Sequence, residues 1–168
     1  MNLRTDRLLI RELTAADAPF MLSLLNEPSF LENIGDRGVR TIADAEAYID
    51  RGPRASYALH GFGLCAVTLA DQGIPIGICG ILKRDVLPEP DIGFAFLPAY
   101  WSQGYAFEAA SAVRDFARET LTLPRLLAIV SPSNASSTRL LGRLGFVPEG
   151  RMTMPGEAHE VELFAARL

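Results

Sequence analysis

A turn between an apolar strand and a long helix has the residue types that bind phosphate. Asp91 to Leu97 is strand-like, and the helix that follows opens with the small and polar run Ser102-Gln103-Gly104-Tyr105-Ala106. A helix N-terminus offers unpaired N–H groups and partial positive charge. A phosphate lying on this backbone would leave no room for bulky side chains at Gly104 and Ala106. Taken alone, the same small residues also suit ordinary packing of a helix on a strand.

A second polar segment follows the next strand-like run. It reads Ser131-Pro132-Ser133-Asn134-Ala135-Ser136-Ser137 and leads into a helix that closes with Leu144-Gly145-Phe146. The chain contains neither G-x-x-x-x-G-K-[ST] nor G-x-G-x-x-G, so neither a P-loop nor a dinucleotide fingerprint competes for the phosphate interpretation. A nucleotide-binding module would also need a phosphate-specific lysine or a magnesium ligand near Gly104, and the sequence shows none there.

Together with the amino-terminal run Thr5-Asp6-Arg7-Leu8-Leu9-Ile10-Arg11, these segments resemble the GNAT acetyltransferase superfamily, specifically its RimJ/RimL-like branch. That branch shows an acidic-Ile-Gly strand, then Pro-x-Tyr-Trp-x-x-Gly-Tyr-Ala, an Asn-x-x-Ser helix start and a Leu-Gly-Phe close. Each piece is loose, but the joint match is specific and covers essentially the whole chain. The resemblance implies direct transfer of an acetyl group from acetyl-CoA to a primary amine, with no metal and no covalent enzyme intermediate.

The resemblance also implies where the cosubstrate lies. Backbone amides around Gln103 to Ala106 would hold the pyrophosphate, and the strand from Phe94 to Leu97 would pair with the pantetheine arm and supply an oxyanion-binding N–H. The cofactor-binding residues that we expect are Phe96, Leu97, Gln103, Gly104, Tyr105, Ala106, Asn134 and Ser137. The wider superfamily often has Arg or Gln where Trp101 stands, which removes one phosphate contact.

Asp91 and Ser137 are the candidate catalytic residues. A protein α-amine has a pKa near 7.7–8.0 and a lysine near 10.4, so a base is useful for preparing the nucleophile. Asp91 stands where some superfamily members carry a catalytic glutamate. The slightly favoured alternative is that Asp91 is a solvated structural acid in the turn after Pro90.

Leu141 occupies the position of the tyrosine that protonates the thiolate in many members. Ser137 could donate a hydrogen bond to the sulfur instead, or simply cap its helix.

Other polar residues are weaker candidates. His60 and His159 are the only histidines, and neither has a Ser or Cys partner or a metal-ligand spacing. We expect His159 to be a solvated hairpin side chain, with a place in the acceptor cleft as the alternative. We expect Arg139 and Arg143 on a solvated helix face, with a phosphate contact as the alternative. The loop from Asn33 to Gly38 is either a wall of the acceptor site or a plain surface loop.

The periodicity predicts one α/β domain over residues 1–168. The expected order is strand, two helices, three strands, helix, strand, helix and two strands, which gives a twisted mixed sheet of about seven strands flanked by helices. The strand–helix–strand unit around residues 91–130 requires one parallel pair. By resemblance, the sheet opens after the strand that ends at Leu97 and holds coenzyme A in the gap. The first helix should stop before Pro28, residues 29–40 should be irregular, and a second helix should start near Ile42.

Composition restricts the partners and the compartment. A formal net charge of -4 and a pI near 5.2 disfavour nucleic acid as a partner, and no apolar run is long enough to span a bilayer. Cys65 and Cys79 fall in strand-like runs and are expected to be buried reduced thiols, which suits the cytoplasm.

The acceptor is the least determined part of the prediction. The expected partner is an amine, preferably a protein N-terminus, and the protein is expected to be a monomer or homodimer. Two alternatives stay open: a small-molecule amine acetyltransferase, and an acyl-CoA-binding protein whose catalysis is impaired by Leu141 and the short Asp91.

Overall fold

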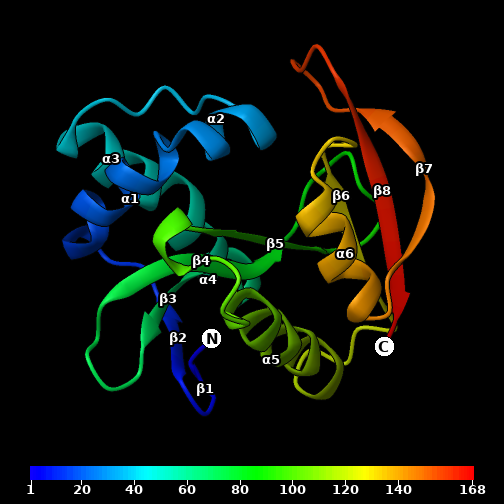
Figure 1. Cartoon of the computed structure of the whole chain (residues 1–168), viewed down its shortest axis with the longest axis horizontal. Helices are drawn as coiled ribbons and strands as arrows, with labels where there is room; N and C mark the ends of the chain where they lie inside the picture. The colour runs from blue at the N-terminus through cyan, green and yellow to red at the C-terminus, as the bar shows by residue number, and fades with distance from the viewer.

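The computed structural model describes residues 1–168, which form one eight-stranded sheet of order β1-β2-β3-β4-β5-β6-β8-β7 (Figure 1). The strands are β1 (Leu3–Arg4), β2 (Leu8–Glu12), β3 (Leu64–Leu69), β4 (Pro75–Leu82), β5 (Asp91–Phe96), β6 (Arg125–Val130), β7 (Val147–Thr153) and β8 (Glu160–Arg167). All neighbours are antiparallel except β5 and β6, which are parallel. The mixed sheet and its parallel pair are as predicted. The additional strand, β1, is too short to show any periodicity in the sequence.

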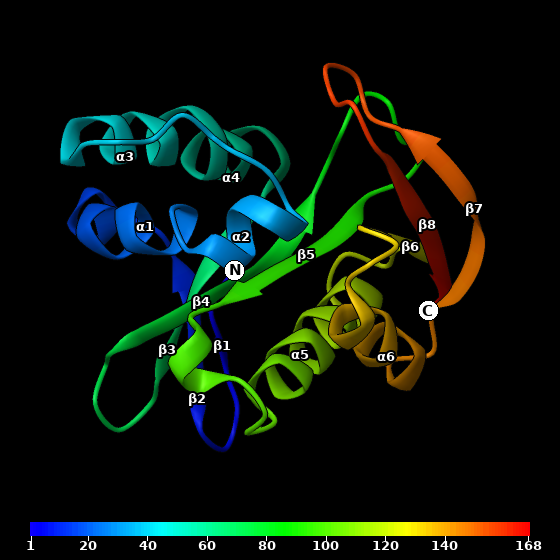
Figure 2. The same cartoon turned by 45° about the horizontal axis from the view of Figure 1, so that its top comes forward.

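Helices cover both faces of the sheet. They are α1 (Ala18–Leu25), α2 (Pro28–Asn33), α3 (Ile42–Ile49), α4 (Ala55–His60), α5 (Tyr105–Glu119) and α6 (Ala135–Arg143). Figure 2 shows α1 to α4 gathered on one side of the central strands and α5 on the other. Each side has its own buried cluster, one including α5 and the other including α1 and α3. None of the helices is long and apolar enough to cross a lipid bilayer.

The α5 helix lies close to the sheet because its inward face carries small side chains. In the sequence, an apolar stripe at helical spacing predicts one buried face; its residues are Ala106, Ala109, Ala110, Val113, Phe116 and Ala117. Of these, Ala109, Ala110, Val113 and Ala117 are fully buried, and the helix contacts β2, β4 and β5. The residue before the helix is Gly104, whose φ of +83° lies in the left-handed region that favours glycine. The first turn of α5 is thereby fixed beside the sheet.

Proline residues explain where the helices between β2 and β3 differ from the prediction. Helix α1 ends before Pro28 as predicted, but Pro28 is also the first residue of α2, so the prediction that residues 29–40 are irregular is wrong for 29–33. Proline fits the first position of a helix because the N–H that it lacks would have no partner there. The next helix, α3, starts at Ile42 as predicted. A π-helical turn containing Pro53 then leads into α4, which the sequence does not reveal.

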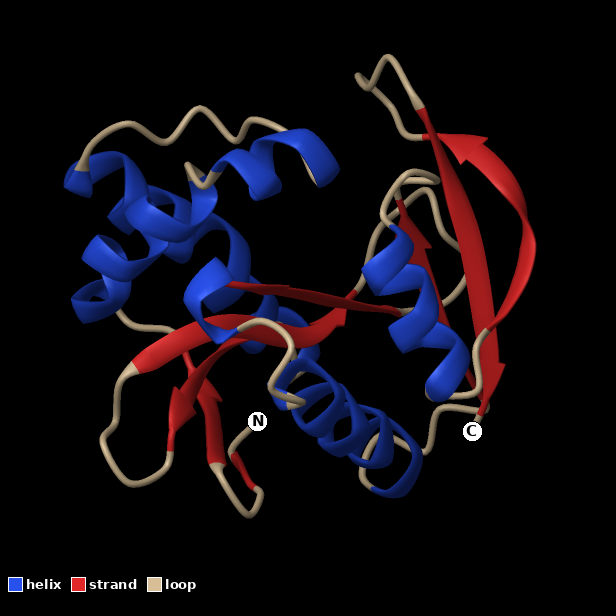
Figure 3. Cartoon of the chain, viewed as in Figure 1, coloured by secondary structure: helices blue, strands red, loops and turns tan.

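The sheet opens between β5 and β6. Their pairing is restricted to Asp91 opposite Leu127, after which the two strands diverge (Figure 3). By contrast, β4 pairs along the whole of β5, from Leu82 opposite Asp91 to Gly77 opposite Phe96. This is the opening that the resemblance implies after the strand ending at Leu97.

The two cysteines are buried and free, as predicted. Cys65 and Cys79 lie opposite each other in the β3–β4 pair. Burial raises the pKa of the Cys65 thiol to about 11 and that of Cys79 further, so both stay protonated at neutral pH.

Candidate active site

A cavity of about 1090 Å³ occupies the opening between β5 and β6. Its walls come from α2 and the loop after it, from β5 and β6, from the start of α6 and from the β7–β8 loop. Among the residues singled out from the sequence, those lining it are Asp91, Asn134, Ser137, Leu141, His159 and part of the loop from Asn33 to Gly38. The remaining candidates, Phe96 to Ala106, do not line this cavity. They follow the end of β5 and the start of α5.

Asp91 is a buried carboxylate at the point where the strands diverge. It is 0% exposed, and Arg84 Nε donates to its Oδ1 at 3.1 Å and its Oδ2 at 3.2 Å. Burial raises the pKa of Asp91 to about 6, although the Arg84 guanidinium opposes part of this rise. The interpretation of Asp91 as a solvated turn acid is therefore wrong, because β4 and β6 flank the residue on both sides.

The backbone of β5 presents polar groups to the same opening. Leu97 N–H donates to Ile76 O across the β4–β5 pair. In an antiparallel pair, alternate residues point their N–H and C=O groups to opposite edges. The N–H and carbonyl of Phe94 therefore point away from β4, toward the gap that β6 leaves. An extended ligand with amide groups could pair with this edge.

The start of α6 offers two hydrogen-bonding side chains to the cavity. Asn134 is the N-cap, and its Oδ1 accepts from Ser137 N–H at 3.2 Å, so its amide NH₂ remains available as a donor. The Ser137 hydroxyl forms no hydrogen bond within the protein, and Asn134 rather than Ser137 caps the helix. The capping interpretation of the Ser137 side chain is therefore wrong.

Leu141 is 1% exposed and lines the cavity as an apolar wall. No hydroxyl group is therefore present at the position where the resemblance would place a tyrosine. The phenol of Tyr48, on α3, does line the cavity. Neither Tyr48 nor Arg84 was singled out from the sequence. The role of Arg84 depends on the pairing of Leu82 with Asp91. This pairing places Arg84, two residues after Leu82, next to the Asp91 carboxylate.

The turn before α5 has an unusual backbone. Ser102 and Gly104 both have positive φ, of 59° and 83°, and a positive φ is uncommon for a residue other than glycine. Gln103 lies between them, and its side chain is turned back to the Ala99 carbonyl at 3.0 Å. A residue other than glycine, such as Ser102, keeps this conformation only where the surroundings hold it in place, and such residues are concentrated at ligand-binding sites.

Arg7, from the β1–β2 hairpin, holds this turn. Its Nη1 donates to Gln103 O at 2.9 Å and its Nε to Glu108 Oε2 at 2.7 Å, and its guanidinium stacks on the Tyr105 ring at 4.3 Å. Thr5 Oγ1 and Arg7 N–H both donate to the other Glu108 oxygen. The amino-terminal motif is thus a support for the turn, a role that the sequence did not indicate.

At the end of β5, some backbone groups are already engaged. Leu97 N–H donates to Ile76 O, and Leu97 O accepts from Tyr100 N–H. Phe96 O accepts from Trp101 Nε1 at 2.9 Å, so the indole closes the turn against the strand. Of these two predicted cofactor residues, Phe96 retains an N–H toward the gap, whereas both backbone groups of Leu97 have partners.

The weaker candidates have the following places. His159 is exposed on the β7–β8 loop and also lines the cavity, so it combines both interpretations. His60 is exposed and stacks on Phe62. Arg139 and Arg143 are both exposed, as expected, and the Arg143 guanidinium also lies over the Phe107 ring, 4.1 Å from its centre.

Comparison with known proteins agrees with this geometry. Residues 7–147 match the family model described as acetyltransferase (GNAT) domain. The chain is 29% identical over 150 residues to the uncharacterized N-acetyltransferase YnaD of Bacillus subtilis, covering 89% of this chain and 85% of YnaD. An acetyltransferase from Agrobacterium tumefaciens is 28% identical, with a TM-score of 0.84 and coverage of 100% and 95%.

The fold is also that of RimL, a ribosomal L7/L12 α-N-protein acetyltransferase solved in complex with coenzyme A. The TM-score is 0.85 at 15% identity, over 100% of this chain and 98% of RimL. The family match spans most of the chain and includes Arg7, the α5 turn and the cavity walls formed by β5, β6 and the start of α6. The chain therefore belongs to the GNAT family and is an acetyl-CoA-dependent acetyltransferase.

Proposed function

We propose that this protein transfers the acetyl group of acetyl-CoA directly to the α-amine at the N-terminus of a protein. The observation that carries the proposal is the pair of the buried Asp91 with the partly exposed Arg84, which puts a carboxylate with a pKa of about 6 in the open cavity. A general base works best when its pKa is near the operating pH. An α-amine has a pKa of about 7.7–8.0, so Asp91 is already ionised at a pH where the acceptor still needs to lose a proton.

The residues present fit coenzyme A in two places. The N–H groups of Gln103 to Ala106 at the start of α5 suit a pyrophosphate because of the helix dipole and the small side chains. The free edge of β5 at Phe94 and Phe96 suits the two amides of the pantetheine arm. Asn134, through its NH₂ group, would hold the arm near its thiol end, beside Ser137.

The transfer would proceed as follows. The amine nitrogen attacks the thioester carbonyl carbon, and its proton passes to Asp91, directly or through water. The oxyanion that forms accepts a hydrogen bond from a β5 N–H, with that of Phe94 best placed. The C–S bond then breaks, and the thiolate accepts a hydrogen bond from the Ser137 hydroxyl. A thiol has a pKa of about 8.5, so the thiolate can leave although Leu141 supplies no proton donor.

The open cavity and the RimL-type fold support a protein N-terminus as acceptor. The cavity is walled by loops on both sides, α2–α3 and β7–β8, between which a chain end could enter. RimL, which shares the fold, is described as an α-N-protein acetyltransferase. A small-molecule acceptor is the second candidate, and an acyl-CoA-binding protein without turnover is the third.

Release of coenzyme A thiol from acetyl-CoA separates these candidates. The acceptors are a peptide with a free N-terminus and no lysine, the same peptide with a blocked N-terminus, a lysine-containing peptide with a blocked N-terminus, and a set of small primary amines. We expect turnover with the first only, with acetylation of its α-amine confirmed by mass spectrometry. Turnover with small amines alone would transfer the assignment to the second candidate. Coenzyme A binding without turnover on any amine would support the third.

A further inference from the structure

A second cavity, of about 590 Å³, adjoins the first beside α3 and is here called the side cavity. Arg37, Tyr48, Leu64 and Leu82 line both cavities. Leu82 lies directly opposite Asp91 in the β4–β5 pair. The side cavity therefore begins one strand away from the proposed base, and a ligand that reaches Asp91 can extend into it.

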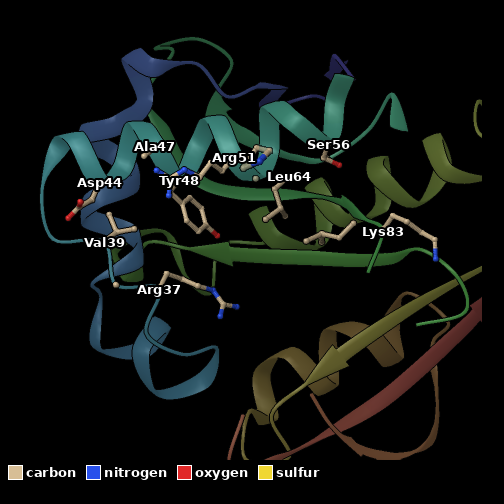
Figure 4. Close-up of a pocket in the computed structure, with 14 residues that line it drawn as sticks. Arg37, Val39, Asp44, Ala47, Tyr48, Arg51, Ser56, Leu64 and Lys83 are labelled. Atoms are coloured by element: carbon tan, nitrogen blue, oxygen red, sulfur yellow. The ribbon is translucent and has the colours of Figure 1, made fainter. Parts of the chain in front are cut away.

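The side cavity collects positive charge in a protein whose net charge is -4. Its charged lining residues are Arg37, Arg51, Lys83 and Asp44. The single carboxylate is already used, because Asp44 Oδ2 accepts from the N–H groups of Arg40 and Thr41 at 3.0 and 3.1 Å. In Figure 4 the Asp44 carboxylate points away from the cavity.

The cations of the side cavity lack strong partners within the chain. Arg51 forms no ion pair, whereas its neighbour Arg54, on the same turn, pairs with Asp50 at 2.6 Å. Arg37 Nη1 lies 3.9 Å from Glu157 Oε1, at the limit of an ion pair. Lys83 Nζ donates only to the Leu87 carbonyl, at 3.2 Å. Figure 4 shows Arg37 and Tyr48 extending into the same space from opposite sides.

We infer that the side cavity binds an anionic group carried by the amine acceptor, with Arg37 and Arg51 as specificity-determining residues. This inference rests on the proposed function. Guanidinium groups bind carboxylates through paired N–H donors, and the Tyr48 hydroxyl can add one more. In a peptide, the group is an acidic side chain near the N-terminus, because an extended chain advances about 3.3 Å per residue and reaches the side cavity within a few residues. An acceptor rich in lysine would be repelled.

The test compares peptides of equal length that differ only at positions two to four. These positions carry glutamate, glutamine or lysine, and free glutamate serves as a small acceptor whose anionic groups are its own carboxylates. We expect kcat/KM to follow the order glutamate, glutamine, lysine, with about a tenfold difference between the extremes at low salt. Raising the salt concentration should shrink the difference, because exposed charges are screened.

Substitutions at two neighbouring arginines provide a matched comparison. Arg51→Ala should reduce the preference for the glutamate peptide several-fold, and Arg51→Glu should turn it toward the lysine peptide. Arg54→Ala removes an arginine from the same turn but outside the side cavity, and it should leave the preference unchanged. Reversal in Arg51→Glu cannot come from a general loss of structure, because the lysine peptide would gain in rate.

The outcomes separate this inference from the proposed function. Equal rates with all three peptides, or a preference that persists in Arg51→Glu, would overturn the inference while leaving N-terminal acetylation intact. No turnover with any peptide but turnover with free glutamate would keep the anionic site and replace the protein acceptor by a small one. No turnover with any amine would overturn both.

Discussion

The Arg84 guanidinium donates to both oxygens of the Asp91 carboxylate, which is itself 0% exposed. The pair keeps a charge available at a site where burial alone would favour the neutral acid. The result is a carboxyl group that ionises near pH 6 rather than near its ordinary value, at the point where the sheet opens.

The activity should depend on pH through the ionisation of Asp91. Asp91 can act as a base only above a pH of about 6, and a base helps most below the pKa of an α-amine, about 7.7–8.0. The ratio of wild-type to Asp91→Asn kcat/KM should therefore be largest between about pH 6 and 8 and fall on both sides. Steady-state rates from pH 5 to 9.5 would measure it. A ratio that is constant over this range would assign Asp91 to positioning rather than proton transfer.

Ionisation of the Asp91 carboxyl group should lower the free energy of unfolding at neutral pH. Because its pKa is raised from 3.8 to about 6, the native state holds this proton more tightly than the unfolded chain. The resulting stabilisation is complete below about pH 4 and is lost as the pH rises through about 6. The free energy of unfolding of Asp91→Asn, relative to wild type, should thus rise by on the order of 3 kcal/mol from pH 4 to pH 7.

Urea unfolding at the two pH values would test this stability effect. Asp85→Asn, at an exposed position close by in the chain, is the control and should show no such change. If the free energies of unfolding of Asp91→Asn and wild type differ by the same amount at both pH values, the pKa of Asp91 is not raised in the folded protein.

Ser137→Ala should lower kcat by roughly tenfold to a hundredfold while leaving the affinity for coenzyme A nearly unchanged, since the hydroxyl acts on the departing sulfur. Ser136→Ala, at the exposed neighbouring position, should be silent. Rapid kinetics together with calorimetric binding would separate the two quantities. Complete loss of turnover with normal binding would instead make Ser137 an essential acid.

Ala106→Phe should weaken binding of coenzyme A by at least tenfold, about 1.4 kcal/mol, because the ring would fill the space proposed for the pyrophosphate. Ala106→Ser keeps the side chain small and should bind normally. Calorimetry would measure both, with melting curves to confirm that the fold is retained. Normal binding by a folded Ala106→Phe protein would place the phosphates elsewhere.

Glu108→Gln tests the support behind the same turn. Burial acts to raise the pKa of Glu108, but the hydrogen bonds from Thr5 and Arg7 lower it overall, so the carboxylate is the stable form at neutral pH. The substitution should cost about 1 to 2 kcal/mol of stability and weaken coenzyme A binding several-fold. Glu119→Gln, at the exposed far end of α5, is the control. Unchanged binding would show that the turn keeps its shape without Arg7 and Glu108.

Much of the fold could be predicted from the sequence because long elements have clear periodicity. The stripe on α5 needed no tertiary information, and the last two strands, which the sequence predicts over about 146–154 and 158–167, are β7 and β8. The short elements were different, because β1 has two residues and α4 follows a proline that usually argues against a continuous helix. In these places packing against the rest of the molecule decided the structure.

The site was predictable to the extent that it depends on motifs. Asp91, Asn134 and Ser137 were identified from their positions and do line one cavity. Arg84, Tyr48 and Arg51 were not, because their roles depend on which strand or helix lies opposite them. The burial of Asp91 could not be read from its place after a proline, since it depends on the strand that pairs on its far side.

The Arg7–Glu108 contact joins residues 101 positions apart in the chain, and this separation has a consequence for folding. Closing so long a loop is entropically costly, and such contacts form late compared with those inside helices and hairpins. Helix α5 can form locally, but the turn before it acquires its support only when the β1–β2 hairpin docks. We therefore expect the ability to bind coenzyme A to appear among the last steps of folding, after most of the secondary structure is in place.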